Sequence, residues 1–274
     1  MGDWQFNYRI ADCEIVLRGT DVGLEALAAS VYEGVRCEKT SARAQVFELE
    51  DRAKGLVLKS AGVEVGVART LNELFQLVEW QLTEIFMRGL GAFFQLHAAV
   101  AVCGDRALVM CGPSEAGKTS LLIGLATSGA RAYTDEIALI ASDDLRIHPF
   151  PRDLIVHSGT QSMFPEILFE QPTWKDFCSY RFVSPVVFKG YGQEAPVTCR
   201  ALLFPVRKGA GGAQLRSLGQ AEAASRLLQQ SFSLWDWGDA AVELLGRLVE
   251  SCPASELSFA NACEAAALLQ NSEV

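Results

Sequence analysis

Residues 112–119 combine two glycines with a lysine and a threonine at a spacing that suits phosphate binding. The segment consists of Gly112, Pro113, Ser114, Glu115, Ala116, Gly117, Lys118 and Thr119. Its glycines let successive backbone N–H groups point into one concavity, where they hold phosphate oxygens at the start of a helix. The lysine ammonium reaches the β- and γ-phosphates, and the threonine hydroxyl ligates Mg²⁺. Together with the following Ser120, the segment predicts a site for a nucleoside triphosphate such as ATP.

The segments on both sides of this loop favour phosphate binding over a chance glycine turn near a lysine. Residues 107–111 form a short apolar run that predicts a buried strand. Residues 120–126 predict a helix, and Gly129 is in the position of a glycine that ends a helix. A strand, a glycine-containing turn and a helix in this order are the context in which the motif binds phosphate.

A phosphate loop does not by itself distinguish hydrolysis from transfer, because a kinase also needs a carboxylate that accepts the hydroxyl proton. Asp135 is the strongest candidate for this base, since it follows an apolar segment one helix after Lys118. Glu136 points to the opposite side of an extended chain, so the two acids can divide the roles of base and metal or water ligand. A solvated strand end is an equally simple interpretation of the pair.

A second acidic pair, Asp143-Asp144, competes for the same role. It follows the apolar residues 137–141, a pattern that resembles the metal site of many nucleotide hydrolases. However, Ser142, Asp143 and Asp144 lie between two alternating segments, and this composition favours an ordinary turn.

The elements before residue 90 predict a small α+β module. Strands are predicted at 13–17, 44–49, 56–58 and 63–67, and a short helix at 24–32. Thr70 and Glu73 form a capping box that opens a longer helix. The apolar stripe of this helix indicates core packing and consists of Leu71, Leu74, Phe75, Val78, Leu82, Ile85 and Phe86.

Residues 91–274 predict the domain that carries the loop. A strand at 93–102 and a turn at 103–105 form a hairpin with the strand that enters the loop. Further strands are predicted at 132–136, 137–140, 145–148, 201–206 and 255–259, and helices at 219–231, 238–251 and 262–269. Residues 152–198 predict loops with short elements.

The composition limits the cell compartments and the classes of binding partner that suit this protein. Half of the 274 residues are hydrophobic and 21% are charged, which is typical of a folded globular protein. The net charge of −9 argues against a nucleic-acid partner. The eight scattered cysteines indicate small buried hydrophobes in a reducing compartment, and we expect a cytoplasmic protein without a membrane segment.

The residues around the loop resemble the catalytic half of the HPr kinase/phosphorylase family, which shares its core with phosphoenolpyruvate carboxykinases. In that family a Leu-His-Gly strand precedes the loop, as Leu96-His97 does here, and an Ala-Asp-Asp motif follows it, at the place of Thr134-Asp135-Glu136. The spacing from Lys118 to Asp135 matches the family's spacing, and the hairpin is the family's own arrangement. The expected fold class is therefore α/β, with a P-loop mixed-sheet core preceded by the small module.

The resemblance implies an ATP-dependent kinase that uses Mg²⁺. Asp135 would act as base on a serine hydroxyl, Glu136 would replace the second acid, and His97 would belong to the hydrogen-bond network of the site. Residues 149–152, 203–205 and 256–259 resemble a divergent bacterial branch that includes kinases encoded with lasso-peptide and other modified-peptide pathways. In that branch Arg152 would contact a phosphate or a substrate carboxylate.

The family signature Glu-Ile/Val-Arg-Gly-Leu-Gly-Ile does not occur in this sequence, so the resemblance does not extend to HPr as the acceptor. Arg207 and Lys208 are weaker candidates for a nucleotide or acceptor loop. The sequence predicts transfer to a serine of a peptide or small protein, and leaves a homo-oligomer open. A nucleotide-binding regulatory protein with slow or no ATP hydrolysis, and a kinase of free serine or a sugar, are the alternatives.

Overall fold

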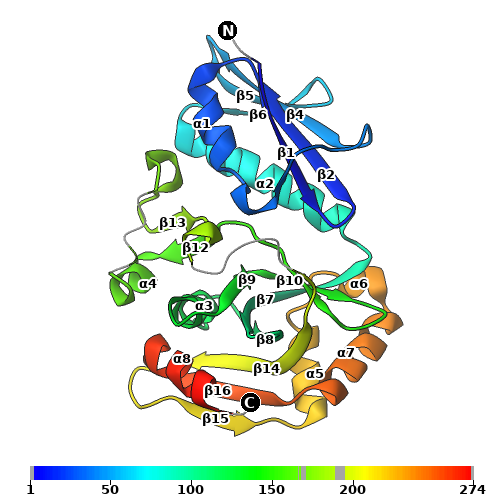
Figure 1. Cartoon of the computed structure of the whole chain (residues 1–274), viewed down its shortest axis with the longest axis vertical. Coiled ribbons are helices and arrows are strands. Elements are labelled where there is room, and N and C mark those ends of the chain that lie inside the picture. The colour runs from blue at the N-terminus through cyan, green and yellow to red at the C-terminus, as the bar shows by residue number, and fades with distance from the viewer. Residues whose placement is uncertain (1–2, 166, 168–170, 189–194, 273–274) are drawn as a thin grey trace. The chain divides into compact units, whose positions relative to one another are not determined.

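Figure 1 shows the computed structural model of the chain, which describes residues 3–165, 167, 171–188 and 195–272. The chain divides into two compact units. Unit 1 comprises Met1–Leu90 and Ile155–Ser184, and unit 2 comprises Gly91–Leu154 and Pro185–Val274. Both units contain helices and sheets, which confirms the mixed α/β class. A single boundary near residue 90 does not describe the division, because Ile155–Ser184 belongs to unit 1.

Unit 1 is built on a six-stranded sheet in the order β3-β1-β2-β4-β5-β6. The strands are β1 (Trp4–Ile10), β2 (Cys13–Gly19), β3 (Arg36–Cys37), β4 (Gln45–Arg52), β5 (Gly55–Ser60) and β6 (Val63–Ala68). Neighbouring strands are antiparallel except β2 and β4, which are parallel. Helices α1 (Val22–Ser30) and α2 (Leu71–Gly89) pack on this sheet. The sequence did not predict β1.

Helix α2 begins and packs as its sequence predicts. The Thr70 side chain accepts a hydrogen bond from the Glu73 backbone N–H at 3.2 Å. The Glu73 carboxylate accepts one from the Arg69 N–H at 2.7 Å, which completes the capping interaction. The buried apolar residues of α2 are Leu74, Phe75, Val78, Leu82 and Phe86, so most of the predicted stripe faces the core.

The returning segment of unit 1 contains β12 (Leu154–His157), α4 (Ser158–Met163), a 3₁₀ turn at Thr173–Lys175 and β13 (Tyr180–Val183). Its 3₁₀ turn is attached to α2, because the Asn72 side chain donates to the carbonyls of Thr173 and Asp176 at 2.9 and 3.0 Å. The buried Lys175 donates to the Ser30 carbonyl at 2.6 Å. These described elements confirm the prediction of loops with short elements.

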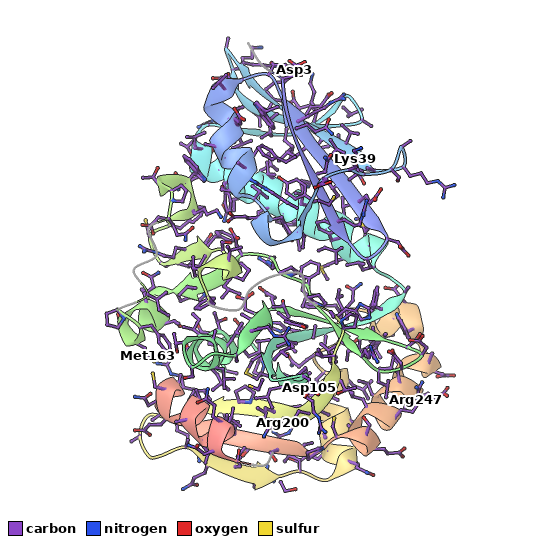
Figure 2. All side chains as sticks on the ribbon, viewed as in Figure 1. Asp3, Lys39, Asp105, Met163, Arg200 and Arg247 are labelled. Atoms are coloured by element: carbon purple, nitrogen blue, oxygen red, sulfur yellow. The ribbon has the colours of Figure 1, made fainter. Side chains whose placement is uncertain are left out.

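Unit 2 is built on an eight-stranded mixed sheet. Its strands are β7 (Phe93–Cys103), β8 (Arg106–Cys111), β9 (Arg131–Thr134), β10 (Ile137–Ala141), β11 (Ile147–His148), β14 (Thr198–Arg207), β15 (Gln214–Ser217) and β16 (Ala254–Phe259). The order is β11-β10-β7-β8-β14-β16-β15, and β9 also pairs with β7. β7 and β8 form the predicted antiparallel hairpin, whose turn contains the Asp105 labelled in Figure 2. β14 is parallel to both β8 and β16.

Two helix pairs pack in unit 2. Helix α3 (Lys118–Thr127) contacts α8 (Ala262–Asn271), and α5 (Gln220–Leu228) contacts α7 (Asp239–Ser251). Ala107, Val109 and Cys111 of β8 share a core with α5 and α7, whereas the alternating Leu108 and Met110 face the other side of the sheet and are also fully buried. A short helix, α6 (Leu234–Trp237), precedes α7. No described helix has the length and apolar character needed to cross a bilayer.

The predicted helix at 219–231 is wrong at its end. α5 ends at Leu228, and Ser231 instead forms an isolated β-bridge with Leu96 of β7. The Gln230 carbonyl accepts a hydrogen bond from the His97 N–H at 2.7 Å, and the Phe232 N–H donates to the Gln95 carbonyl at 3.0 Å. Pairing with this edge of β7 therefore outweighs the local helical preference of these residues. The sequence also missed β15.

We predict that Gly124 is required for the close packing of α3 on α8. A Cβ at this position would lie 3.2 Å from both the Ala262 carbonyl oxygen and the Ala266 Cβ. Gly124→Val should therefore lower the free energy of unfolding by about 1–3 kcal/mol through overpacking, measured by urea denaturation. Gly246 in α7 is the matched control, because a Cβ added there would meet nothing within 4 Å, and Gly246→Ala should stabilise by about 0.5–1 kcal/mol. Unchanged stability of Gly124→Val would contradict the close helix contact.

Candidate active site

The loop between β8 and α3 contains two residues in the left-handed region of backbone conformation. Glu115 and Gly117 adopt positive φ angles of 64° and 95°, and the Ala116 N–H donates to the Pro113 carbonyl at 3.3 Å. Gly117 is the N-cap of α3. A Cβ on Gly117 would lie 2.8 Å from Cζ of Phe259, so both the backbone angle and the space favour glycine. The predicted sequence of strand, turn and helix is confirmed.

The Lys118 side chain turns back over the start of the loop. Its Nζ donates to the carbonyls of Gly112 and Pro113 at 2.8 and 3.1 Å, and lies 3.1 Å from Nε2 of His97. The residue is buried, and burial lowers the pKa of its ammonium group, which the nearby Glu136 and Asp135 charges partly oppose. The loop therefore holds a cation beside its first carbonyls, at the place where the sequence predicts the terminal phosphates.

Asp135 and Glu136 lie in an interruption between two strands that share one partner. β9 pairs Thr134 with Val100 of β7, and β10 pairs Ile137 with His97. The Ala98 N–H donates to the Glu136 carbonyl at 3.0 Å, which keeps the interruption against β7.

The Thr134 side chain fixes the bend at this interruption. Its hydroxyl oxygen accepts hydrogen bonds from the N–H groups of Glu136 and Ile137, at 3.3 and 3.1 Å. The bend brings the acidic pair beside the loop, and Asp135 is 4% exposed. Its carboxylate acts to raise the pKa of Lys118, in the same sense as that of Glu136.

Four of the predicted site residues form a continuous series of polar contacts. Lys118 contacts His97 as above, and Nε2 of His97 lies 3.7 Å from Oε1 of Glu136. Nη1 of Arg152 lies 3.4 Å from the other Glu136 oxygen. The Arg152 side chain is 7% exposed, so Arg152 is not the surface arginine that a turn position alone would suggest. We call Lys118, His97, Glu136 and Arg152 the polar series.

The protonation of His97 follows from its surroundings. Burial lowers the pKa of its imidazole below the ordinary 6.5, and the Lys118 ammonium lowers it further. The Glu136 carboxylate and a hydrogen bond to the Gln230 side chain act in the opposite direction. The net effect favours a neutral imidazole near pH 7, which can accept one hydrogen bond and donate another.

The competing acidic pair, Asp143-Asp144, lies in the turn that follows β10, as predicted. The Asp144 N–H is bonded to the Asp143 side chain at 2.9 Å, and Arg247 donates to the carbonyls of Ser142 and Asp143, both at 2.9 Å. Arg247 is the α7 residue labelled in Figure 2. Because the turn follows the opposite end of β10 from Glu136, the pair is separated from the polar series by the length of the strand.

A cavity of about 410 Å³ adjoins the first half of the loop. It is lined by Cys111, Gly112, Pro113, Ser114, Glu115, Ala116, Phe204, Pro205, Val206, Arg207, Arg226, Gln229 and Gln230. Arg226 makes ion pairs with Glu222 and Glu256 at 2.7 and 2.9 Å. Sequence reasoning named Arg207 and the segment 203–205 but missed Arg226 and Gln230, because only the tertiary fold brings the end of α5 to the loop.

The available metal ligands are oxygen atoms. Thr119 and Ser120 lie in the first turn of α3, and Asp135 and Glu136 supply carboxylates near Lys118. These donors suit Mg²⁺, which usually takes one or two protein oxygens together with phosphate oxygens and waters. In the described part of the chain, no group of three or more His, Cys, Asp or Glu side chains is arranged to hold a metal ion.

Two comparisons with known proteins give no relatives for this arrangement. No model of a protein family matches the chain, and no curated protein matches it.

We predict that the charges of Lys118 and Glu136 shift the His97 pKa in opposite directions. Lys118→Met removes a cation beside the imidazole and should raise the His97 pKa, whereas Glu136→Gln removes an anion and should lower it. NMR titration can follow the three histidine side chains, and His97→Gln identifies the signal of His97. Shifts of the same sign in both variants would contradict the arrangement of the polar series.

Proposed function

We propose that the chain is an ATP-dependent, Mg²⁺-requiring kinase that transfers the γ-phosphoryl group to a serine hydroxyl of a peptide or small protein. The observation that carries the proposal is the meeting of the phosphate loop with the Asp135-Glu136 bend. Lys118 of the loop lies against His97, and β7 holds the acidic bend beside the same histidine. A cation for phosphate and a carboxylate for the acceptor are the two groups that phosphoryl transfer to an alcohol requires.

In this proposal residues 112–120 hold the phosphates of ATP through backbone N–H groups, and Lys118 neutralises charge on the terminal phosphates. Bound Mg²⁺ would neutralise further phosphate charge, with Thr119 and Glu136 as its protein ligands. Asp135 accepts the proton of the serine hydroxyl. The serine oxygen forms a bond to the γ-phosphorus, the bond from that phosphorus to the bridging oxygen breaks, and ADP leaves.

His97 and Arg152 have supporting roles. Nε2 of His97 lies 3.1 Å from Nζ of Lys118 and 3.7 Å from Oε1 of Glu136, so the imidazole connects the two charged side chains. The buried Arg152 fixes the Glu136 carboxylate and offers a guanidinium to a phosphate or a substrate carboxylate. This set of groups agrees with the resemblance to the HPr kinase/phosphorylase family, including its branch associated with modified peptides.

We predict that Asp135→Asn abolishes transfer and preserves nucleotide binding. Loss of the proton acceptor should reduce the transfer rate by about 10²–10⁴-fold. The substitution keeps the size of the side chain, so ATP binding should be preserved. The assay uses radiolabelled ATP, Mg²⁺ and a serine-containing peptide library, and ATP affinity is measured by calorimetry. Asp143→Asn, in the turn beyond β10, is the matched control and should retain transfer.

The outcomes separate the alternatives. Transfer that survives in Asp135→Asn would refute the catalytic assignment. ATP binding or slow hydrolysis by the wild-type chain, without transfer to any peptide, free serine or sugar, would favour a regulatory nucleotide-binding protein. Transfer to free serine or a sugar alone would favour a small-molecule kinase.

A further inference from the structure

The chain presents an exposed aromatic ring directly beside the polar series. Phe232 is 44% exposed, and its ring centroid lies 5.5 Å from that of His97. A large apolar side chain that stays exposed beside a site indicates a surface for binding another molecule, because burial would otherwise be favoured. Phe232 was not among the residues that the sequence singled out.

The backbone holds this ring in a fixed position. The Phe232 N–H donates to the Gln95 carbonyl at 3.0 Å, and the Gln95 N–H donates to the Ser233 hydroxyl oxygen at 3.0 Å. Downstream, Trp237 packs on Phe94 of β7 with ring centroids 5.6 Å apart. The backbone that carries the Phe232 ring is therefore attached to β7 at Phe232 itself and at residues after it.

The neighbouring side chains connect Phe232 to the loop. Ser231 pairs with Leu96, and the side chains of Gln230 and Phe232 on either side of it both lie at the His97 imidazole. Gln230 interacts with the His97 imidazole and also lines the cavity beside the loop. A molecule that brings a hydroxyl to His97 and Asp135 therefore has the Phe232 ring next to it.

We propose that Phe232 determines acceptor specificity by contacting an apolar side chain adjacent to the phosphorylated serine. The inference rests on the proposed kinase function and extends it to the class of acceptor. The backbone groups on both sides of Ser231 already form hydrogen bonds with β7. An acceptor is therefore recognised here through side-chain contacts. A flanking apolar side chain is present in a peptide or protein and is absent from free serine and from sugars. The exposed ring provides an apolar surface on which such a side chain can pack.

The test uses a library of serine-centred peptides in which one flanking position at a time is fixed. With radiolabelled ATP and Mg²⁺, the full wild-type chain should phosphorylate members with Phe, Tyr or Leu beside the serine about threefold to tenfold faster than members with Ala or Glu. Phe232→Ala should remove this preference, so that members with Phe, Tyr or Leu beside the serine and members with Ala are phosphorylated at equal rates. Val242→Ala, which shortens another exposed side chain of unit 2, should keep the preference.

A gain of new specificity distinguishes recognition from loss of folding. Phe232→Lys should favour acidic residues beside the serine, a change that an unfolded protein cannot produce. A wild-type chain without apolar preference, or a Phe232→Ala variant that keeps it, would overturn the inference and leave the kinase proposal intact. Failure of the wild-type chain to phosphorylate any peptide would overturn both.

Discussion

The register of β7 is the constraint on which the rest of the site depends. One edge of this strand pairs with β9 and β10, and the interruption between them places Asp135 and Glu136 opposite the strand at His97 and Ala98. The other edge pairs with β8 and then with residues 230–232. A shift by one residue would turn His97 to the other face of the sheet and separate it from Lys118. The hydrogen bonds of one strand therefore align the loop, the acidic bend and Phe232.

Burial of several ionisable groups in one place gives the site its chemistry and has an energetic cost. Lys118, Asp135 and Arg152 each have less than a tenth of their surface exposed. Charges removed from water are tolerated only when opposite charges and hydrogen bonds compensate for lost hydration. The contacts of Lys118 with two loop carbonyls and of Arg152 with Glu136 supply part of this compensation. Under the proposed function, phosphate oxygens would replace these loop carbonyls as partners of the Lys118 ammonium group.

Sequence reasoning predicted the local parts of this arrangement well. The turn with glycines at 112 and 117, the hairpin before it, the helix cap at Thr70 and the turn at Asp143-Asp144 all depend on neighbours along the chain. The sequence could not predict that residues 229–231 leave their helix, because the β7 edge that attracts them is more than a hundred residues away. The burial of Arg152 and the position of Gln230 at the cavity likewise depend on residues that are distant in the sequence, so the sequence did not predict them. Ile155–Ser184 belongs to unit 1 because of contacts with residues far away in the sequence, such as the hydrogen bond from Asn72 to Thr173.

Under the proposed function, the pairing of residues 230–232 with β7 links acceptor specificity to catalysis in one structural element. The His97 N–H donates to the Gln230 carbonyl, and the His97 ring contacts Phe232. A movement of this segment would change the cavity at the loop, the imidazole contact with Lys118 and the position of the exposed ring together. Under the proposed function, an acceptor that packs against Phe232 would therefore stabilise the segment in the position that orders His97. Binding energy from a side chain that does not react could then contribute to the alignment of the groups that do.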